Sequence, residues 1–255
     1  MIVCKSAAEI ERMRAANALV ADVLAELATM VAPGVTTADL DAAAERLVRA
    51  GGAEPAFKGY RGYPRTLCAS VNEQVVHGIP SARALVEGDI ISLDMGVKLN
   101  GFYGDSAITV PVGRVSEVAA TLLRVTQESL EKGIEQVRLG GRISDIGHAI
   151  QQHVEAHGLS VVREFVGHGI GSALHEEPQI ANYGEPGRGP RLAEGMTLAI
   201  EPMVNVGRPA VKVLADGWTA VTKDGSLSAH FEHTVAVTKN GPLVLTRRTV
   251  PARAG

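Results

Sequence analysis

Residues 92–107 read Ser92-Leu93-Asp94-Met95-Gly96-Val97-Lys98-Leu99-Asn100-Gly101-Phe102-Tyr103-Gly104-Asp105-Ser106-Ala107. Asn100-Gly101 separates two runs in which apolar residues alternate with polar or small ones. Asn-Gly is the pair that a two-residue type I′ turn prefers, because both central residues of that turn need positive φ. We therefore predict a β-hairpin here, and the length of the turn fixes its register.

This register places Asp94 opposite Ala107 and Gly96 opposite Asp105. Both aspartates then lie on one face among small residues, diagonal to each other at roughly 7–8 Å between backbones. The other face is expected to be core and carries Ile91, Leu93, Met95, Val97, Phe102, Ile108 and Val110. The hairpin alone leaves two interpretations open, because its carboxylates could face solvent or hold a metal ion.

The composition narrows the class of protein. With 255 residues and 45% hydrophobic content, the chain can bury a full core as one large domain or two intimate halves. A net charge of −3 gives no electrostatic reason to expect a nucleic-acid partner. Two cysteines, no signal-peptide core and no run near the ~18 apolar residues of a membrane span predict a cytoplasmic protein with no membrane partner.

Four helices are expected from capping residues and apolar spacing. The predicted helices run from the capping box Ser6-Ala7-Ala8-Glu9 to Pro33-Gly34, from Thr36 or Thr37 to Gly51-Gly52, from Glu117 to about Arg138 after the cap Ser116, and from Ser144-Asp145 to His157-Gly158. Residues 34–52 match residues 140–158 at six of nineteen positions. This weak repeat favours two pseudo-symmetric halves of one domain over 1–255, at about 1–112 and 113–246, followed by a flexible tail at 247–255.

Strands and helices are grouped in blocks, which is typical of an α+β fold with mostly antiparallel strands. The further strand candidates are 66–71, Val161–Phe165, Met196–Ile200, Val211–Leu214, Trp218–Val221, Glu232–Thr238 and Leu243–Thr246.

Two more acids resemble those of the hairpin. Glu201 shares a strand face with Thr197 and Ala199, and Glu232 shares one with Thr234 and Ala236. Four buried carboxylates would repel one another strongly unless a cation neutralised them. The sequence therefore favours a metal centre over a solvated hairpin.

Histidines supply the remaining candidate ligands. His168 lies between Gly167 and Gly169, which we expect to bend the backbone so that the ring reaches inward. Four acids and one imidazole suit two divalent ions, with Mn, Fe, Co or Zn as candidates. His77 and His175 flank turn residues and are either site residues or surface histidines. His148, His153 and His157, on the fourth predicted helix, are interpreted as structural or solvated.

Taken together, these motifs resemble the type I methionine aminopeptidases, which have the pita-bread fold. The resemblance covers about residues 3–246 and lies in Asn72-Glu73, His77-Gly78-Ile79-Pro80, the Asp94 to Asp105 interval, Gly167-His168-Gly169-Ile170-Gly171, His175-Glu176-Glu177-Pro178, Ile200-Glu201-Pro202-Met203 and Phe231-Glu232-His233-Thr234. It implies a hydrolase that removes the N-terminal methionine of nascent proteins and peptides when the second residue is small. It also implies a monomer that meets its substrates as nascent N-termini, at the ribosome.

The resemblance also assigns roles to residues. The implied ligands of two divalent ions are Asp94, Asp105, His168, Glu201 and Glu232, with Asp105 and Glu232 shared between the ions. Glu201 would act as general base, His175 would donate to the oxyanion, and His77 would contact the scissile nitrogen. The implied methionine pocket is lined by Tyr60, Tyr63, Cys68 and Trp218, with Phe57 and Leu174 nearby, where relatives often carry Cys and Phe.

Three alternatives stay open at this point. The chain could be an Xaa-Pro exopeptidase of the same fold, although such enzymes usually carry an additional N-terminal domain. It could be a binding module that has lost catalysis, although such relatives lose ligands and all five are present here. It could also be a structural α+β domain without metal.

Overall fold

The predicted hairpin consists of β4 (Ile90–Leu99) and β5 (Phe102–Pro111). The computed structural model describes residues 1–248, and in it Asn100 and Gly101 have φ values of 52° and 82° at the hairpin tip. Asp94 pairs with Ala107 and Gly96 with Asp105, so the predicted register is confirmed. Most of the predicted apolar face is fully buried, whereas Ile108 and Val110 are only partly buried.

Four α-helices lie within residues 1–248, together with one short 3-10 helix. They are α1 (Ala7–Met30), α2 (Thr37–Ala50), α3 (Glu117–Glu135), α4 (Ile143–Ala156) and η1 (Tyr60–Gly62). Ser6, Thr36 and Ser116 cap the first three helices, as predicted. The start of α4 is a correction: Arg142 is its N-cap, because the Asp145 carboxylate accepts a hydrogen bond from the Arg142 backbone at 2.7 Å. Ser144 instead donates to the Arg188 carbonyl.

The strands within residues 1–248 form four antiparallel sheets. Besides β4 and β5 they are β1 (Glu54–Pro55), β2 (Cys68–Val71), β3 (Gln74–Val76), β6 (Ser160–Val161), β7 (Gly167–Gly169), β8 (Glu176–Ile180), β9 (Thr197–Ile200), β10 (Met203–Asn205), β11 (Val211–Val213), β12 (Ala220–Thr222), β13 (Ser228–His230), β14 (His233–Thr238) and β15 (Gly241–Val244). In the sheets, β4 pairs with β1, β2 and β5; the remaining orders are β13-β10-β6, β11-β12-β3 and β15-β14-β9-β7-β8. The α+β prediction with antiparallel strands is confirmed.

Several strand predictions need correction, and among them the strands expected over 218–221 and 243–246 are observed as β12 and β15, at Ala220–Thr222 and Gly241–Val244. The strand predicted over Val161–Phe165 ends at Val161, where its pairing with β10 stops. A strand that was not predicted, β8, follows directly after His175 and pairs with β7. Its polar and proline-containing sequence resembles a turn, so only the pairing with β7 identifies it as a strand.

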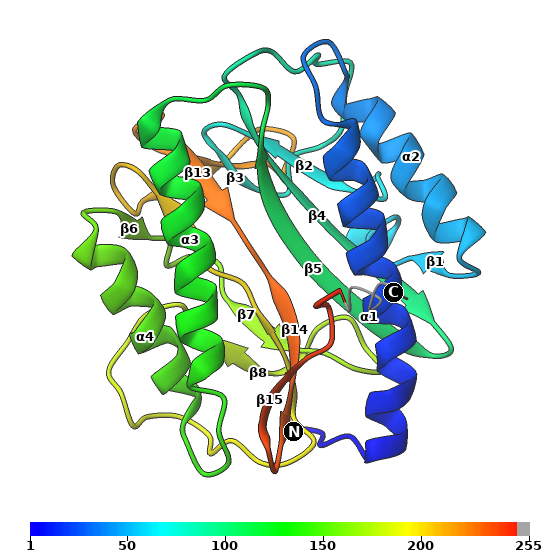
Figure 1. Cartoon of the computed structure of the whole chain (residues 1–255), viewed down its shortest axis with the longest axis vertical. Coiled ribbons are helices and arrows are strands. Elements are labelled where there is room, and N and C mark those ends of the chain that lie inside the picture. The colour runs from blue at the N-terminus through cyan, green and yellow to red at the C-terminus, as the bar shows by residue number, and fades with distance from the viewer. Residues whose placement is uncertain (249–255) are drawn as a thin grey trace, which may run out of the picture.

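The helices pack in two pairs on either side of the long central strands (Figure 1). One core cluster joins α1 and α2 to the apolar face of β4, and another joins α3 and α4 to β9 and β14. Thr37 and Ile143 begin α2 and α4, and Ala50 and Ala156 end them, an offset of 106 at both ends. The division into halves at 1–112 and 113–246 nevertheless stays a prediction.

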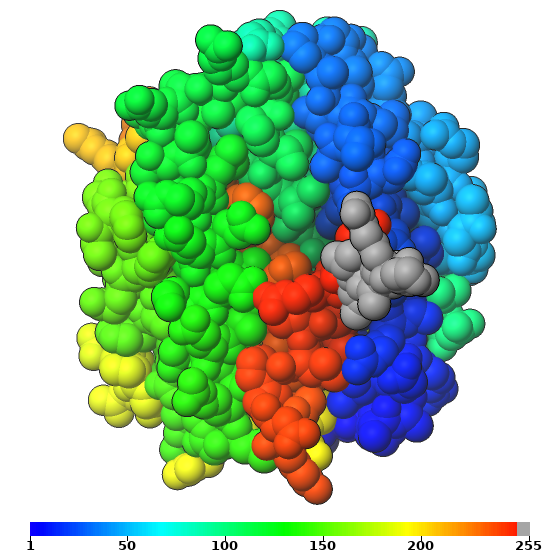
Figure 2. All heavy atoms as spheres, in the orientation of Figure 1, coloured from blue at the N-terminus to red at the C-terminus, as the bar shows by residue number. Residues whose placement is uncertain are grey.

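The last described strands, β14 and β15, pass between the helix pairs (Figure 1). The orange and red C-terminal strands fill the seam between green α3 and blue α1 (Figure 2). Arg247 and Arg248, which we assigned to the flexible tail, form ion pairs with Glu131 of α3 and Asp22 of α1. The rest of that tail, 249–255, lies outside the described residues. Among residues 1–248 there is no helix with the length and apolar content of a membrane span.

Candidate active site

The face of the hairpin turned away from α1 and α2 carries Asp94 and Asp105, which are both buried. Glu232 lies next to them just before β14, and its backbone N–H donates to the Ala107 carbonyl at 2.9 Å. The Thr234 hydroxyl donates to the Asp105 carbonyl at 2.8 Å. These bonds join β5 to β14 and bring three acids from two distant segments together.

The other two predicted ligands come from the sheet that contains β14. His168 is in β7, opposite Ala199 of β9, and Glu201 follows the last residue of β9. The Asn182 side chain donates to the Glu201 carbonyl at 3.0 Å and fixes the chain at this point. Pairing of β7 with β9 therefore places the imidazole beside the fourth acid.

Gly167 and Gly169 serve a purpose different from the predicted one. Neither has positive φ, and both lie in the extended strand β7. A Cβ at Gly167 would lie 2.3 Å from the Ala199 carbonyl oxygen, and one at Gly169 would lie 2.2 Å from that of Glu177. The glycines are needed because neighbouring backbones pass too close for any side chain, and not because the chain bends at His168.

The five side chains converge closely. His168 Nε2 is 3.6 Å from Glu201 Oε1 and 3.9 Å from Asp105 Oδ2. Asp105, His168 and Glu232 each offer one ligand atom, and these three atoms lie within 4.8 Å of one another. Asp94 Oδ1, Asp105 Oδ1 and Glu232 Oε1 are buried and have no hydrogen-bond partner among residues 1–248.

Burial and mutual repulsion make this set unfavourable without a cation. Burial raises the pKa of Asp105 to about 7, and burial together with neighbouring carboxylates raises the pKa values of Asp94, Glu201 and Glu232 well above their ordinary range. Burial lowers the pKa of His168 to about 4, so its ring is neutral and has a lone pair to donate. Unpartnered carboxylate oxygens beside a neutral imidazole form a donor set that fits divalent metal ions.

One pocket contains every residue that the sequence predicted for the site. It is lined by Phe57, Tyr60, Tyr63, Cys68, His77, Asp94, Asp105, His168, Leu174, His175, Glu201, Trp218 and Glu232, and by Arg61, which was not predicted. His175 Nδ1 is 3.0 Å from the Tyr60 hydroxyl, and the two rings stack. Trp218 meets Tyr63 edge-on at 5.1 Å between ring centroids. The pocket thus has an acidic set of candidate metal ligands and aromatic walls.

His77 lies in this pocket with an unusual backbone. Its φ of 60° is in the left-handed region, which non-glycine residues seldom adopt outside constrained sites. Its ring contacts the edges of Phe165 and Trp218. Burial lowers its pKa to about 4, with a further contribution from His175, so the ring is neutral at pH 7.

The sequence reasoning missed His230. This buried residue ends β13, and its Nε2 lies 3.5 Å from Glu201 Oε2. Burial lowers its pKa to about 3, and neither ring nitrogen has a hydrogen-bond partner within the described residues. Alternation offered a signal, because His230 and Glu232 are two residues apart in one extended segment.

Comparison with known proteins supports a single family. The model of metallopeptidase family M24 matches residues 11–239. The chain belongs to the M24 metallopeptidase family. Methionine aminopeptidase 1 of Bacillus subtilis is 55% identical to this chain over 247 residues, which cover 97% of this chain and all of the relative.

Solved M24-like structures agree with the fold. The crystal structure of methionine aminopeptidase from Thermotoga maritima has a TM-score of 0.96 and 49% identity, and the match covers 97% of this chain and all of that one. Prolidase from Pyrococcus furiosus has a TM-score of 0.79 at 23% identity, with 97% of this chain and 66% of the prolidase chain covered. The second likeness shows the fold alone. The pita-bread prediction is confirmed for this M24 metallopeptidase.

Proposed function

We propose that this chain is a methionyl aminopeptidase that removes the N-terminal methionine of nascent proteins and peptides when the second residue is small. One observation carries the proposal: an acidic, buried donor set lies at an aromatic pocket in a chain that is 55% identical to a methionine aminopeptidase along its whole length. A metal-dependent peptidase follows from family membership, and the methionine substrate follows from the near-full-length relatives.

We assign five side chains as ligands of two divalent ions: Asp94, Asp105, His168, Glu201 and Glu232. Asp105 and Glu232 would be ligands of both ions. Two such ions, when bound, activate a water molecule for attack and polarise the scissile carbonyl. Their positive charge also offsets the repulsion between four buried carboxylates. The unpartnered oxygens of Asp94, Asp105 and Glu232 support this assignment. Mn, Fe, Co and Zn remain the candidate ions, because carboxylate and imidazole ligands accept each of them.

Glu201 is the proposed general base. Its carboxylate lies between the rings of His168 and His230, at 3.6 and 3.5 Å. A carboxylate at this position would take a proton from the attacking water and return it to the leaving amine.

Two histidines are proposed to act on the scissile peptide. For His175 to donate from Nε2 to the developing oxyanion, its Nδ1 must accept a hydrogen bond, and the Tyr60 hydroxyl is 3.0 Å away. Burial lowers the pKa of His175, which keeps the ring neutral for this donation. His77, held against Phe165 and Trp218, is proposed to contact the scissile amide nitrogen.

The pocket walls support selectivity for methionine. Tyr60, Tyr63, Cys68 and Trp218, with Phe57 and Leu174, offer apolar surface and aromatic edges. An unbranched thioether fills irregular apolar space and gains from contact with ring edges. The side chain of the second residue would lie against the metal ligands, so only small residues are expected to fit there.

A metal-reconstituted assay tests the proposal. We expect the protein, after incubation with Mn²⁺ or Co²⁺, to cleave Met-Ala-Ser and to leave Ala-Pro-Ala intact. Preference for Ala-Pro-Ala would identify an Xaa-Pro enzyme instead. Cleavage of neither peptide by metal-loaded protein would favour a binding module, and less than one bound divalent ion per chain would favour a structural domain.

The partners and location are proposed from the same function. The N-termini of nascent chains are available at the ribosome in the cytoplasm, and we propose that a monomer acts there. Light scattering would detect a dimer, and cosedimentation with translating ribosomes would test the encounter.

A further inference from the structure

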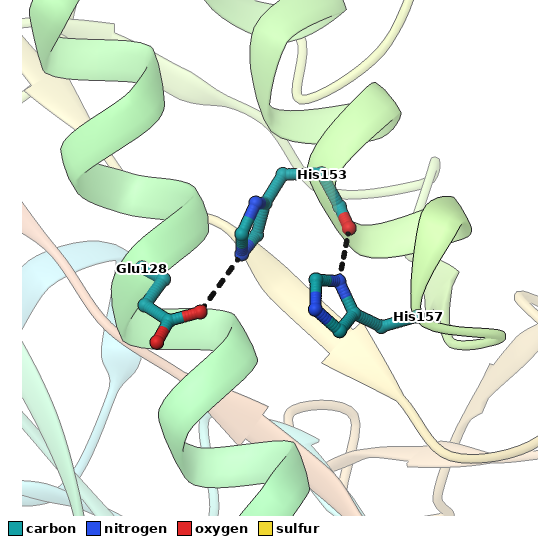
Figure 3. A group of neighbouring side chains, drawn as sticks. All are labelled: Glu128, His153 and His157. Carbon is teal, nitrogen blue, oxygen red and sulfur yellow. Dashed lines mark hydrogen bonds and ion pairs between the residues drawn. The ribbon is translucent and has the colours of Figure 1, made fainter.

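Three potential metal ligands meet on the surface between α3 and α4 (Figure 3). Glu128 comes from α3, whereas His153 and His157 come from the last turn of α4 and the residue that caps it. The two histidines are four positions apart, so they lie on one side of the helix. None of the three lines the catalytic pocket.

The spacing of these side chains is close to that of a coordinated ion. Each residue offers one ligand atom, and the three atoms lie within 4.8 Å of one another. His153 Nε2 and Glu128 Oε2 are 3.1 Å apart, and the two imidazole centroids are 4.7 Å apart. Ligands of a tetrahedral Zn²⁺ with bonds of about 2.1 Å are separated by roughly 3.4 Å. His157 is exposed and the Glu128 side chain is 42% exposed, so core packing does not prevent these side chains from rotating toward that separation.

A hydrogen bond to the backbone fixes the orientation and the tautomer of His157. His157 Nδ1 donates to the His153 carbonyl at 2.8 Å, which places the proton on Nδ1 and leaves Nε2 with a lone pair. Metal-binding histidines usually have this second hydrogen bond, because it fixes the tautomer and the orientation of the ring. His157 is therefore held in a form that can bind a metal ion.

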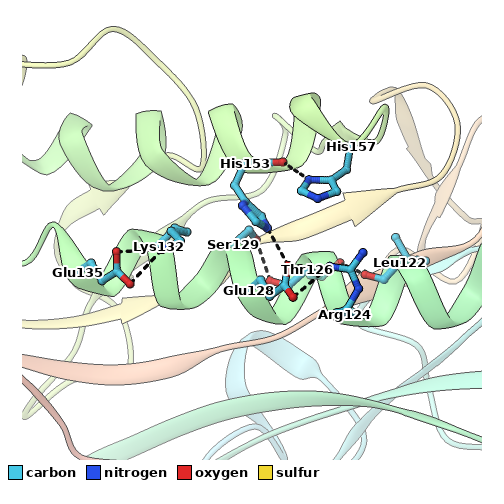
Figure 4. A network of polar contacts seen from close by, with 9 residues as sticks. All are labelled: Leu122, Arg124, Thr126, Glu128, Ser129, Lys132, Glu135, His153 and His157. Atoms are coloured by element: carbon cyan, nitrogen blue, oxygen red, sulfur yellow. Dashed lines mark hydrogen bonds and ion pairs between the residues drawn. The ribbon is translucent and has the colours of Figure 1, made fainter.

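The charges around the cluster are compatible with a cation. Arg124 donates to both oxygens of Glu128, at 3.0 and 2.9 Å, yet a carboxylate has about four lone-pair positions and can still offer one to a metal (Figure 4). Lys132 is paired with Glu135, one turn further along α3. One carboxylate and two imidazoles thus face one another across the two helices.

We propose that Glu128, His153 and His157 form a second metal site, which binds a borderline divalent ion such as Zn²⁺ and links α3 to α4. Two imidazoles and one carboxylate are ligands that Zn²⁺ accepts, and water would complete the tetrahedron. Binding requires His153 to carry its proton on Nδ1 in place of Nε2, an exchange that solvent allows because the side chain is 18% exposed.

Zinc binding by the full-length protein tests this site. We expect wild-type chain, dialysed against low-micromolar Zn²⁺, to hold one more ion than His157→Gln or Glu128→Gln. Removal of a ligand should weaken the affinity of this site for Zn²⁺ at least about tenfold. Loss of a residue that only supports a metal ligand already lowers metal affinity by about 10- to 100-fold. His148→Gln is the matched control, because His148 is on the same helix but bonds to Gly184 outside the cluster. Peptidase activity should be unchanged in all three variants.

Crystals grown with Zn²⁺ give a second, direct measurement. Anomalous density at the zinc edge should lie between the three side chains in wild type and should be absent in His157→Gln. Equal zinc content in wild type and both ligand variants would overturn the proposal, as would density only at the catalytic pocket. If one variant fails to fold by circular dichroism, the other variant and the wild-type map still decide the outcome.

Discussion

The ammonium group of Lys5 forms a buried ion pair with the carboxylate of Glu176, the residue that follows His175. Glu176 also accepts hydrogen bonds from the Ala173 backbone and the Ser172 hydroxyl. The side chains are only 4% and 11% exposed. The segment before α1 is thus joined to the turn that presents His175 to the pocket, across 171 positions of sequence.

Lys5→Met should destabilise the protein and reduce its activity. It leaves the Glu176 carboxylate buried without its counter-ion, and breaking a buried pair in this way costs about 3–5 kcal/mol. Thermal unfolding and peptide kinetics measure the two effects. Arg14→Met is the control, since it breaks a pair with Glu11 whose side chains are 44% and 73% exposed and should change stability by less than about 1 kcal/mol. Equal losses in both variants would show that Lys5 has no special role.

The metal-free protein should lose stability as the pH rises from 6.5 to 8.5. Burial raises the pKa of Asp105 to about 7 and the pKa values of Asp94, Glu201 and Glu232 well above normal. Groups with a raised pKa in the folded state stabilise it below their unfolded pKa, and this contribution is lost as the pH rises through the folded pKa. Each proton that only the folded state retains changes stability by about 1.4 kcal/mol per pH unit.

The pH window matters because buried histidines oppose this trend at lower pH. Burial lowers the pKa values of His168 and His77 to about 4, so below about 6.5 the unfolded state binds protons that the folded state does not. Above pH 6.5 the contribution of the histidines fades and that of the carboxylates dominates, joined near pH 8.5 by the thiol of Cys68, whose pKa burial also raises. Melting temperatures of chelator-treated protein should therefore fall across the window, and those of metal-loaded protein should stay nearly constant. A rise for the chelated protein would contradict the electrostatic interpretation.

Asp94→Asn should affect activity and metal-free stability in opposite directions. An amide is a poor ligand for a divalent ion, so we expect kcat/KM to fall at least about 100-fold. The same change removes one of four repelling carboxylates, so the metal-free variant should melt no lower than metal-free wild type. Wild-type kinetics in this variant would remove Asp94 from the ligand set.

The parts of the site that local sequence rules govern could be predicted. Asn100-Gly101 determined the hairpin register, and alternation along the strands then placed Asp94 and Asp105 on one face. Helix caps are equally local: Ser6 and Ser116 were predicted correctly, and Thr36 is one of the two residues predicted to begin the second helix. The caps depend on residues three positions apart, and the hairpin depends on one turn dipeptide and the alternation of the two strands that it joins.

Features that depend on tertiary contacts could not be predicted in the same way. The glycines beside His168 are needed for the close approach of β9 and β8, which nothing in the local sequence indicates. The Lys5–Glu176 pair joins residues far apart in the chain, and β8 is a strand only because β7 pairs with it. His230 was missed although it alternates with Glu232, because its contact in the site is Glu201, which comes from a distant segment of the chain.

His175→Ala should lower kcat more than it raises KM. A hydrogen bond to the oxyanion forms mainly in the transition state, and loss of such a donor costs roughly 100- to 1,000-fold in kcat. Tyr60→Phe is the informative companion, because it keeps the stacked ring and removes only the hydroxyl 3.0 Å from Nδ1. Its effect on kcat should be smaller. An increase in KM alone for His175→Ala would indicate a role in substrate binding only.

The chain should keep its own Met1. Its second residue is Ile2, a large β-branched side chain that is expected to clash with the metal ligands in the proposed active site. Ile2 also packs against the core cluster of α3 and α4, whereas Met1 is fully exposed, so the bond between them is held near the folded surface. Intact-mass measurement of protein purified from cells should give the mass with Met1. Ile2→Ala supplies the contrast, because its small second residue should permit removal of Met1 by the enzyme itself when metal is added. Loss of Met1 from the wild-type chain would contradict the proposed selectivity for small second residues.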